Sequence, residues 1–252
     1  MSALRRIRRS AAWWWPLVRL APGPFWRARF ALARTGRPTR VRLRSGAVEL
    51  DFEVAGVGDL IGLREVFVER EYELELPRAP ERVVDLGANI GAVTLRFAAR
   101  WPAAEILALE PEPHTFARLE RNAAPYPRIT AERLAAGGRA GELVVRRGTD
   151  SLSSSTLPHA GERGSPVRAL TLDDLVERCG GRIDLLKFDI EGAEAELLRC
   201  ARRLGSVSAL VGELHEDITG VPGGELAGLL PHSRVELEPL PQPGRALVRA
   251  WL

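Results

Sequence analysis

The 252-residue sequence has few cysteines and no internal repeat or low-complexity block, and these absences exclude several classes of protein. Its two cysteines, Cys179 and Cys200, stand far apart and lack the spacing of a metal site. We therefore expect buried free thiols and a cytoplasmic, reducing compartment rather than a disulfide-stabilised secreted domain. The length and the 45% hydrophobic content suit one domain of about 200 residues plus an extension.

Acidic residues are absent from the first 45 positions, which hold 12 arginines and four of the six tryptophans. The apolar run near Trp14 is only about eight residues long and is interrupted by Pro16 and Arg19, so it is too short to span a bilayer. This arm, residues 1–40, suits peripheral contact with an anionic membrane at its inner face. Packing of its aromatic rings on the protein is the alternative. An RNA-binding arm would need a recognition signature that the sequence lacks, so nucleic acid is not expected.

Lysine is nearly absent as well, because every basic residue except Lys187 is arginine. A compact ammonium in such a chain indicates a position that does not admit a guanidinium. Lys187 shares a strand face with Asp189, since alternate residues of a strand point the same way. We expect Lys187 to pair with Asp189 or Glu191 and to set their protonation.

Residues 82–91, Arg-Val-Val-Asp-Leu-Gly-Ala-Asn-Ile-Gly, are the stretch around which the chain is organised. A short apolar run, a glycine turn and a helical pattern follow one another, which predicts a ligand site at the C-terminal edge of a parallel sheet. Gly87 and Gly91 flank Asn89, which stands where a dinucleotide fingerprint has its middle glycine.

Asp85 indicates the class of ligand. A carboxylate beside the turn repels a pyrophosphate but attracts the amino group and sulfonium of S-adenosylmethionine. Capping of an ordinary turn is the alternative role for this acid. Glu110, at the end of the second strand, would accept hydrogen bonds from ribose hydroxyls. Ala135, at the end of the third strand, is small enough to leave room for an adenine ring.

Periodicity divides the chain into the arm at 1–40, a cap or lid at 41–80, and a cofactor-binding domain at 81–252. Alternating residues predict a hairpin over 41–54, and a helix follows over 59–69. The predicted strands of the large domain are 82–86, 105–110, 129–135, 142–146, 183–189, 207–215, 234–240 and 245–251, and its clearest helices are 92–100, 111–123 and 171–179.

Taken together, these motifs resemble the FkbM family of S-adenosylmethionine-dependent methyltransferases over about residues 40 to 217. The first matching segment, at 84–91, is common to methyltransferases broadly, whereas the segment at 185–194 is specific to the family. The matching segments are Val-Asp-Leu-Gly-Ala-Asn-Ile-Gly (84–91), Leu-Glu-Pro (109–111), Thr-Leu-Asp-Asp-Leu (171–175), Leu-Leu-Lys-Phe-Asp-Ile-Glu-Gly-Ala-Glu (185–194) and Glu-Leu-His (213–215).

The resemblance implies an α/β fold: a doubly wound, Rossmann-like methyltransferase sheet of seven strands with the last strand antiparallel, here with an N-terminal extension. It also implies O-methylation of a hydroxyl on a sugar, glycolipid or secondary metabolite. By resemblance, Asp85, Gly87, Asn89 and Gly91 hold the methionine end of the cofactor, and Glu110 holds its ribose.

Methyl transfer to an alkyl hydroxyl benefits from a nearby base or cation. The candidate catalytic residues are Lys187, Asp189, Glu191 and His215, which follow or lie within the fourth and fifth strands. His215 is predicted to be a general base, with an ordinary turn histidine as the alternative. A divalent metal held by Asp189, Glu213 and His215 is a further hypothesis.

Two other functions fit parts of the sequence. An NAD-linked oxidoreductase would share the strand–turn–helix unit, but Asp85 and the missing middle glycine disfavour it. A non-catalytic, membrane-docked binding module would explain the arm, although the cofactor-site residues look complete.

Overall fold

The computed structural model describes residues 11–145 and 164–252 and divides the chain into two compact units, residues 1–71 and 72–252. This division comes before residue 80, so the segment predicted as a cap or lid is split between the units. Residues 72–80 belong to the second unit because the chain's C-terminal strand holds them. Arg249 Nε donates to the Glu73 carbonyl oxygen at 3.3 Å, and Trp251 Nε1 donates to the Glu75 carbonyl oxygen at 3.0 Å.

Two helices, a hairpin and a third helix make up the described part of the first unit. The predicted hairpin is confirmed, with a left-handed Gly46 (φ 62°) in its turn. The predicted helix over 59–69 is present, but its second half has π-helical hydrogen bonding. The elements are α2 (Ala11–Arg19), α3 (Pro24–Ala33), β1 (Thr39–Ser45), β2 (Val48–Val54), α4 (Val57–Arg64) and η1 (Glu65–Glu69).

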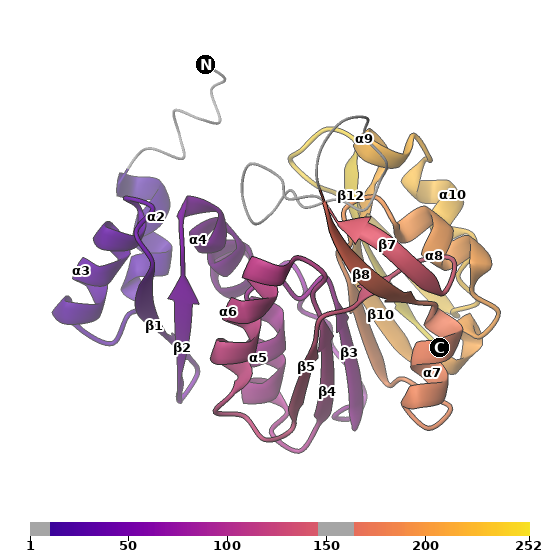
Figure 1. Ribbon diagram of the computed structural model, residues 1–252, viewed down its shortest axis with the longest axis horizontal. Helices are drawn as coiled ribbons and strands as arrows, with labels where there is room; N and C mark the ends of the chain where they lie inside the picture. The colour runs from indigo at the N-terminus through magenta and orange to yellow at the C-terminus, as the bar shows by residue number, and fades with distance from the viewer. Residues whose placement is uncertain (1–10, 146–163) are drawn as a thin grey trace. The chain divides into compact units, whose positions relative to one another are not determined.

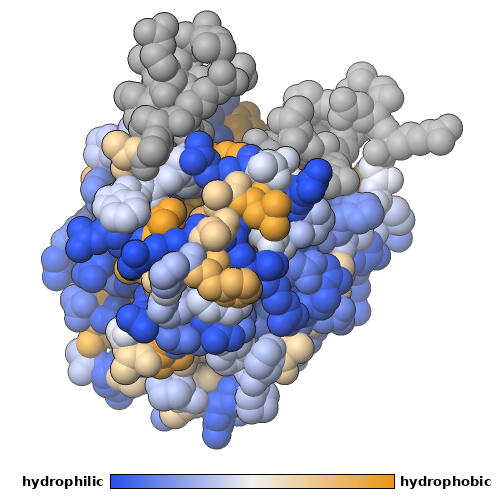
Figure 2. Space-filling model, turned by 90° about the vertical axis from the view of Figure 1, so that its left-hand side faces the viewer, coloured by the Kyte–Doolittle hydropathy of each residue, from blue (hydrophilic) through white to orange (hydrophobic). Residues whose placement is uncertain are grey.

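The aromatic residues of this unit divide between its interior and its surface. Trp14 is buried, and the Arg64 guanidinium lies over the Trp13 ring, 4.5 Å from its centroid. In contrast, Trp15 is 51% exposed and Phe25 is 65% exposed. Figure 2, which views the molecule from the left-hand side of Figure 1, shows apolar patches between hydrophilic residues. Residues 1–10 of the arm lie outside the described residues, and none of the described helices has the length and apolar character to cross a membrane.

The second unit is built on a seven-stranded sheet with the order β11-β12-β10-β9-β3-β4-β5 (Figure 1). Five neighbouring strands are parallel, whereas β12 runs antiparallel to both β10 and β11. The predicted doubly wound sheet with an antiparallel last strand is therefore confirmed. The strands are β3 (Arg82–Leu86), β4 (Glu105–Leu109), β5 (Ile129–Glu132), β9 (Leu185–Phe188), β10 (Ala209–His215), β11 (Arg234–Pro239) and β12 (Arg245–Trp251).

Helices cover both faces of this sheet. Helices α5 (Ala92–Arg100) and α6 (Pro113–Ala123) lie on one side, and α7 (Leu172–Arg178), α8 (Glu194–Cys200) and α10 (Gly223–Ala227) lie on the other (Figure 1). Alternate residues of β3 face opposite ways, so Val84 and Leu86 join the core beneath α7 and α8. Asp85 points to the α5 side, where Thr94 of α5 meets it. The short elements η2 (Leu204–Ser206) and α9 (Glu216–Thr219) complete the unit.

A second, three-stranded sheet takes residues that were predicted to extend the main one. Strand β5 ends at Glu132, and β6 (Ala135–Ala136) pairs with β8 (Ser165–Leu170), which pairs with β7 (Gly141–Val145). Ala135 packs in the core of this small sheet, opposite Ala169 and only 2% exposed. Ala135 therefore does not end the third strand, as was predicted, whereas its place beside an adenine stays a prediction.

Both cysteines are free thiols, as predicted, but they are not both buried. Cys179 is half-buried after α7, and Cys200 is exposed at the end of α8. The amphipathic pattern of α8 explains the exposure of Cys200. Leu197 and Leu198 pack in the core, and the helix positions that follow them face solvent.

Candidate functional site

The turn between β3 and α5 has an unusual backbone. Gly87, Asn89 and Gly91 all have positive φ, at 69°, 52° and 90°, a region that only glycine adopts without strain. At Gly87 space is also limiting, because an added Cβ would stand 1.8 Å from the Asp189 carbonyl oxygen. The glycine therefore lets the turn and the end of β9 approach each other, and it places the turn beside residues 189–194.

Asp85 does not face outward from this turn. Its side chain is completely buried, Thr94 Oγ1 donates to its Oδ2 at 2.6 Å, and Lys187 Nζ lies 3.0 Å from its Oδ1. The prediction that this carboxylate directly attracts a cationic cofactor therefore needs correction. An ammonium inside the fold already neutralises its charge, because β3 and β9 are paired with Asp85 opposite Lys187.

Lys187 also has a different partner from the one predicted. It pairs with Asp85 on the neighbouring strand rather than with Asp189 or Glu191, because its side chain crosses to β3. The ammonium also donates to the carbonyl oxygens of Leu86 and Gly87, at 3.2 and 2.8 Å. Lys187 thus fixes the backbone at the start of the turn, with a side chain that is only 3% exposed.

Glu110 lies directly after β4 and faces the same turn. Its Oε2 accepts from the Asn89 N–H at 3.0 Å, and its Oε1 accepts from the Glu112 N–H at 2.9 Å. Burial raises the pKa of Glu110 to about 7, although these two hydrogen bonds lower it. Each carboxylate oxygen has a second lone pair, so Glu110 can accept further hydrogen bonds from a ligand.

A second group of charges, here called the acidic cluster, lies past the ends of β9 and β10. His215 is fully buried, and its Nε2 lies 3.5 Å from Glu213 Oε1, 3.6 Å from Glu191 Oε2 and 3.7 Å from Asp189 Oδ1. The cluster comprises the side chains of Asp189, Glu191, Glu194, Glu213, His215 and Arg245.

Glu194 orients the imidazole of the acidic cluster. Its buried carboxylate lies 2.9 Å from His215 Nδ1 and also accepts from the N–H groups of Ile190 and Gly192. These bonds stabilise the turn in which Glu191 has the left-handed φ of 48°. Glu194 therefore fixes both the ring of His215 and the loop that carries Glu191.

Arg245, on the antiparallel strand β12, closes the other side of the acidic cluster. Its guanidinium lies 3.2 Å from Glu213, 3.7 Å from Glu191 and 3.2 Å from the half-exposed Asp217. Burial, together with the charge of Asp189, raises the pKa of Glu191 to about 8 and that of Glu213 to about 7.

The environment of His215 bears on its predicted role. Burial lowers its pKa, but the hydrogen bond to Glu194 and the charges of Asp189 and Glu191 raise it to about 9. An imidazole with that pKa is protonated at neutral pH and does not take a further proton. Without a bound cation, this environment thus favours a charged imidazole over the predicted general base.

Three residues among these contacts had no distinct signal in the sequence. Thr94 and Arg245 are recognised only once α5 and β12 are placed against the sheet. Tyr72 donates to Asp189 Oδ2 at 3.0 Å and lies under the Lys187 ammonium. It precedes β3, the first strand of the seven-stranded sheet. Glu194 could have been found, because it stands in the family-specific segment at 185–194.

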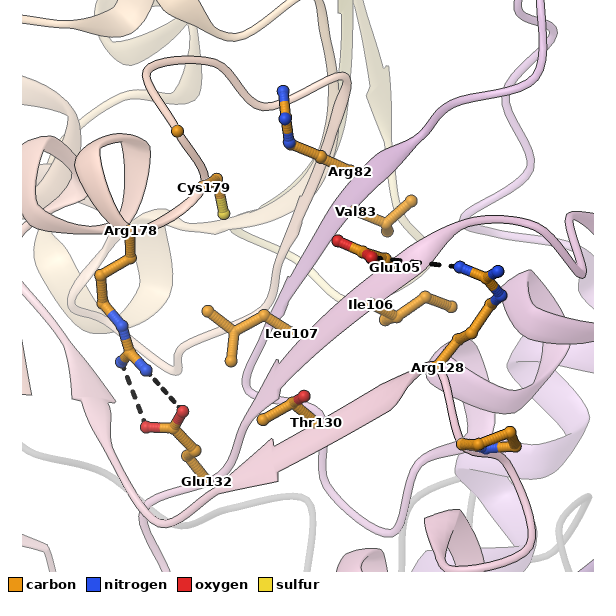
Figure 3. Close-up of a pocket in the computed structure, with 12 residues that line it drawn as sticks. Arg82, Val83, Glu105, Ile106, Leu107, Arg128, Thr130, Glu132, Arg178 and Cys179 are labelled. Carbon is orange, nitrogen blue, oxygen red and sulfur yellow. Dashed lines mark hydrogen bonds and ion pairs between the residues drawn. The ribbon is translucent and has the colours of Figure 1, made fainter.

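A separate hollow of about 840 Å³ lies across β3, β4 and β5, beside the C-terminal end of α7 (Figure 3). Arg82 and Glu105 line it at the starts of β3 and β4, with Arg178 and Glu132 forming an ion pair on one side. None of the predicted site residues lines this hollow.

Comparison with known proteins identifies the chain's relatives. The sequence model of the methyltransferase FkbM domain matches residues 85–221. Methyltransferase sdnD of Sordaria araneosa is 31% identical, over 54% of this chain and 66% of that protein, so the match spans slightly less than two thirds of the relative. The hexuronic acid methyltransferase AglP of Haloferax volcanii is 27% identical, over 74% of this chain and 78% of that protein.

A crystal structure of methyltransferase FkbM from Methylobacillus flagellatus has a similar fold. The TM-score is 0.50 at 17% sequence identity, and the match covers 77% of this chain and 54% of the other. At this identity the likeness concerns the fold alone. The family match, which includes more than half of the sequence and both the turn at 87–91 and the acidic cluster up to His215, is the stronger finding: this chain belongs to the FkbM methyltransferase family.

Proposed function

We propose that this chain uses S-adenosylmethionine to methylate a hydroxyl of a small molecule, namely a sugar, a glycolipid or a secondary metabolite. The observation that carries the proposal is the turn at residues 87–91 together with Glu110. The turn opens helix α5, and the Glu110 carboxylate binds the turn's own backbone at Asn89. An acid in this position can accept hydrogen bonds from ribose hydroxyls, and Asn89 stands where a dinucleotide-binding turn has its middle glycine.

The chemistry fits the position of the site. S-adenosylmethionine, held by the turn at residues 87–91 and by Glu110, would supply the methyl group from its sulfonium, and the acceptor hydroxyl would give its proton to water or to a neighbouring carboxylate. Alignment of the three reacting atoms supplies much of the rate. The close approach of Gly87 to Asp189 puts the acidic cluster beside the turn, where an acceptor would lie. The name of the relative AglP, a hexuronic acid methyltransferase, supports a sugar as the acceptor.

Peripheral membrane contact through residues 1–40 is a further part of the proposal. The exposed Trp15 and Phe25, in a segment without acidic residues, support it. A glycolipid acceptor would be presented at such a surface.

Isothermal titration calorimetry tests the cofactor. We expect S-adenosylmethionine and S-adenosylhomocysteine to bind and NADH not to bind, and we expect Glu110→Ala to lose most of the affinity. Glu120→Ala, an exposed change on α6, is the matched control and should bind as the wild type does. Binding of NADH in place of S-adenosylmethionine would instead support an oxidoreductase, and equal binding by Glu110→Ala would remove the role of Glu110.

A further inference from the structure

The acidic cluster contains polar atoms whose bonding capacity is not used. Among the described residues, His215 Nε2 and Asp189 Oδ1 are both buried and have no hydrogen-bond partner. They face each other across 3.7 Å, a separation too long for a hydrogen bond. Buried polar atoms are nearly always satisfied, so two such atoms pointing into one space indicate a missing ligand.

Among the described residues, carboxylates outnumber the cationic groups of the acidic cluster. The carboxylates of Asp189, Glu191, Glu194 and Glu213 surround one imidazole and one guanidinium. Arg245 also forms an ion pair with Asp217, and the nearby Lys187 forms its ion pair with Asp85. Buried carboxylates without enough positive charge are costly, and they attract a cation.

Asp189, Glu191 and His215 have the geometry of a ligand set. One ligand atom from each lies within 4.8 Å of the others. Ligands of one ion at bond lengths of about 2.1 Å stand roughly 3 to 4 Å apart, which is close to the spacing around His215 Nε2. The sequence predicted Glu213 as the third ligand, but Glu213 accepts a hydrogen bond from Arg245 at 3.2 Å. Glu191 is the third member of the ligand set in the structure.

Glu194 supplies the supporting contact that such a site requires. A metal-binding histidine generally donates its other ring N–H to a carboxylate, which fixes its orientation and tautomer. The 2.9 Å contact between His215 Nδ1 and Glu194 has this arrangement and leaves Nε2 directed at Asp189 and Glu191.

We propose that Asp189, Glu191 and His215 bind a divalent cation of the Mg²⁺ or Mn²⁺ class, with Glu194 as a positioning residue. Two carboxylates and one imidazole form a mainly oxygen donor set, and Mn²⁺ accepts the imidazole more readily than Mg²⁺ does. The use of this cation beside an acceptor hydroxyl rests on the proposed function, but its binding does not.

Electron paramagnetic resonance with MnCl₂ tests the site on the full chain without any methyl donor. We expect one Mn²⁺ to bind per chain and Mg²⁺ to compete for it. Asp189→Asn, which retains an acceptor for Tyr72, should weaken binding by more than about 100-fold, and Glu194→Gln by about 10- to 100-fold. Glu216→Gln, the same kind of change at the exposed neighbour of His215, should leave binding unchanged.

Failure to bind Mn²⁺, or equal binding by Asp189→Asn and the wild type, would overturn the cation site and show that a protonated His215 alone balances the cluster. Calorimetry with S-adenosylmethionine on the same samples separates the two proposals. Mn²⁺ binding without cofactor binding would remove the proposed function and keep the cation site. Cofactor binding without Mn²⁺ binding would do the reverse.

Discussion

Strand β9 carries or borders two groups of buried charge that are built in opposite ways. Toward β3, Lys187 and Asp85 form a pair in which each charge meets one of opposite sign. Toward β10, the acidic cluster sets four carboxylates around the two cationic side chains His215 and Arg245.

This difference sets a structural use of charge against the ligand-binding use that we propose. In the Asp85–Lys187 pair the two charges neutralise each other, Thr94 donates to the carboxylate, and the ammonium donates to the backbone of the turn. In the acidic cluster carboxylates outnumber cations among the residues that the structure describes, and we propose that this excess holds a ligand. The predictions below test this contrast.

The largest expected effect comes from breaking the balanced pair. Lys187→Met keeps the length of the side chain but leaves Asp85 buried without its cation, and it should lower the free energy of unfolding by about 3–5 kcal/mol. Urea denaturation measures this loss. The double variant Asp85→Asn/Lys187→Met should regain much of it, because no charge then remains. A loss below about 1 kcal/mol in the single variant would contradict a tightly coupled pair.

Glu110 is also a buried carboxylate, but its hydrogen-bond partners are backbone N–H groups rather than a cationic side chain. Because its pKa is raised from 4.5 to about 7, its contribution to stability is fully present below about pH 4.5 and is lost as the pH rises through 7. The free energy of unfolding of the wild type should thus fall by up to about 3 kcal/mol more than that of Glu110→Gln between pH 4.5 and 8. Denaturation at several pH values measures the slope. Parallel slopes in the two proteins would show that Glu110 does not titrate in this range.

The close contact between the two charge groups can be tested at Gly87. Gly87→Ala should cost about 1–3 kcal/mol more than Gly220→Ala, and it should weaken binding of S-adenosylmethionine. The two glycines have nearly equal φ, 69° and 67°, but only at Gly87 would the added Cβ meet a backbone oxygen, that of Asp189. Thermal and urea unfolding compare the variants. Equal losses would mean that the turn and the end of β9 can separate freely.

The smallest effect concerns the first unit, where the excess charge is positive and on the surface. Trp15→Ser/Phe25→Ser should reduce sedimentation with phosphatidylglycerol vesicles, with an affinity loss on the order of tenfold. Leu229→Ser, a change at a 40% exposed leucine of the second unit, is the control. Unchanged sedimentation of the double variant would remove the membrane contact.

Helices and strands were predicted well where residues close together in the sequence determine them. The capping box of Thr171 and Asp174 begins α7 as expected, and the alternation at residues 41–54 forms the hairpin. The position of Glu110 beside the turn also followed from chain order, because parallel strands end at one edge of the sheet.

Pairings between distant segments could not be obtained in this way. The single lysine was noticed, but its partner depends on β9 lying beside β3, and strand order is not encoded in local periodicity. Ala135 was misplaced for the same reason, since a neighbouring hairpin, β7 and β8, draws it into another sheet. Arg245 is separated from Glu191 by more than fifty positions of sequence, and only the antiparallel last strand brings them together.

The placement of β12 has a consequence for biosynthesis. Among the described strands β11 pairs only with β12, and β12 inserts between β11 and β10, so neither joins the sheet before residues 245–251 have left the ribosome. Until then the edge of β10 stays open on the nascent chain, and Glu191 and Glu213 lack the guanidinium that accompanies them in the finished fold. The acidic cluster therefore gains its guanidinium only after β12 has been synthesised, and until then the open edge of β10 is a point of misassembly on the growing chain.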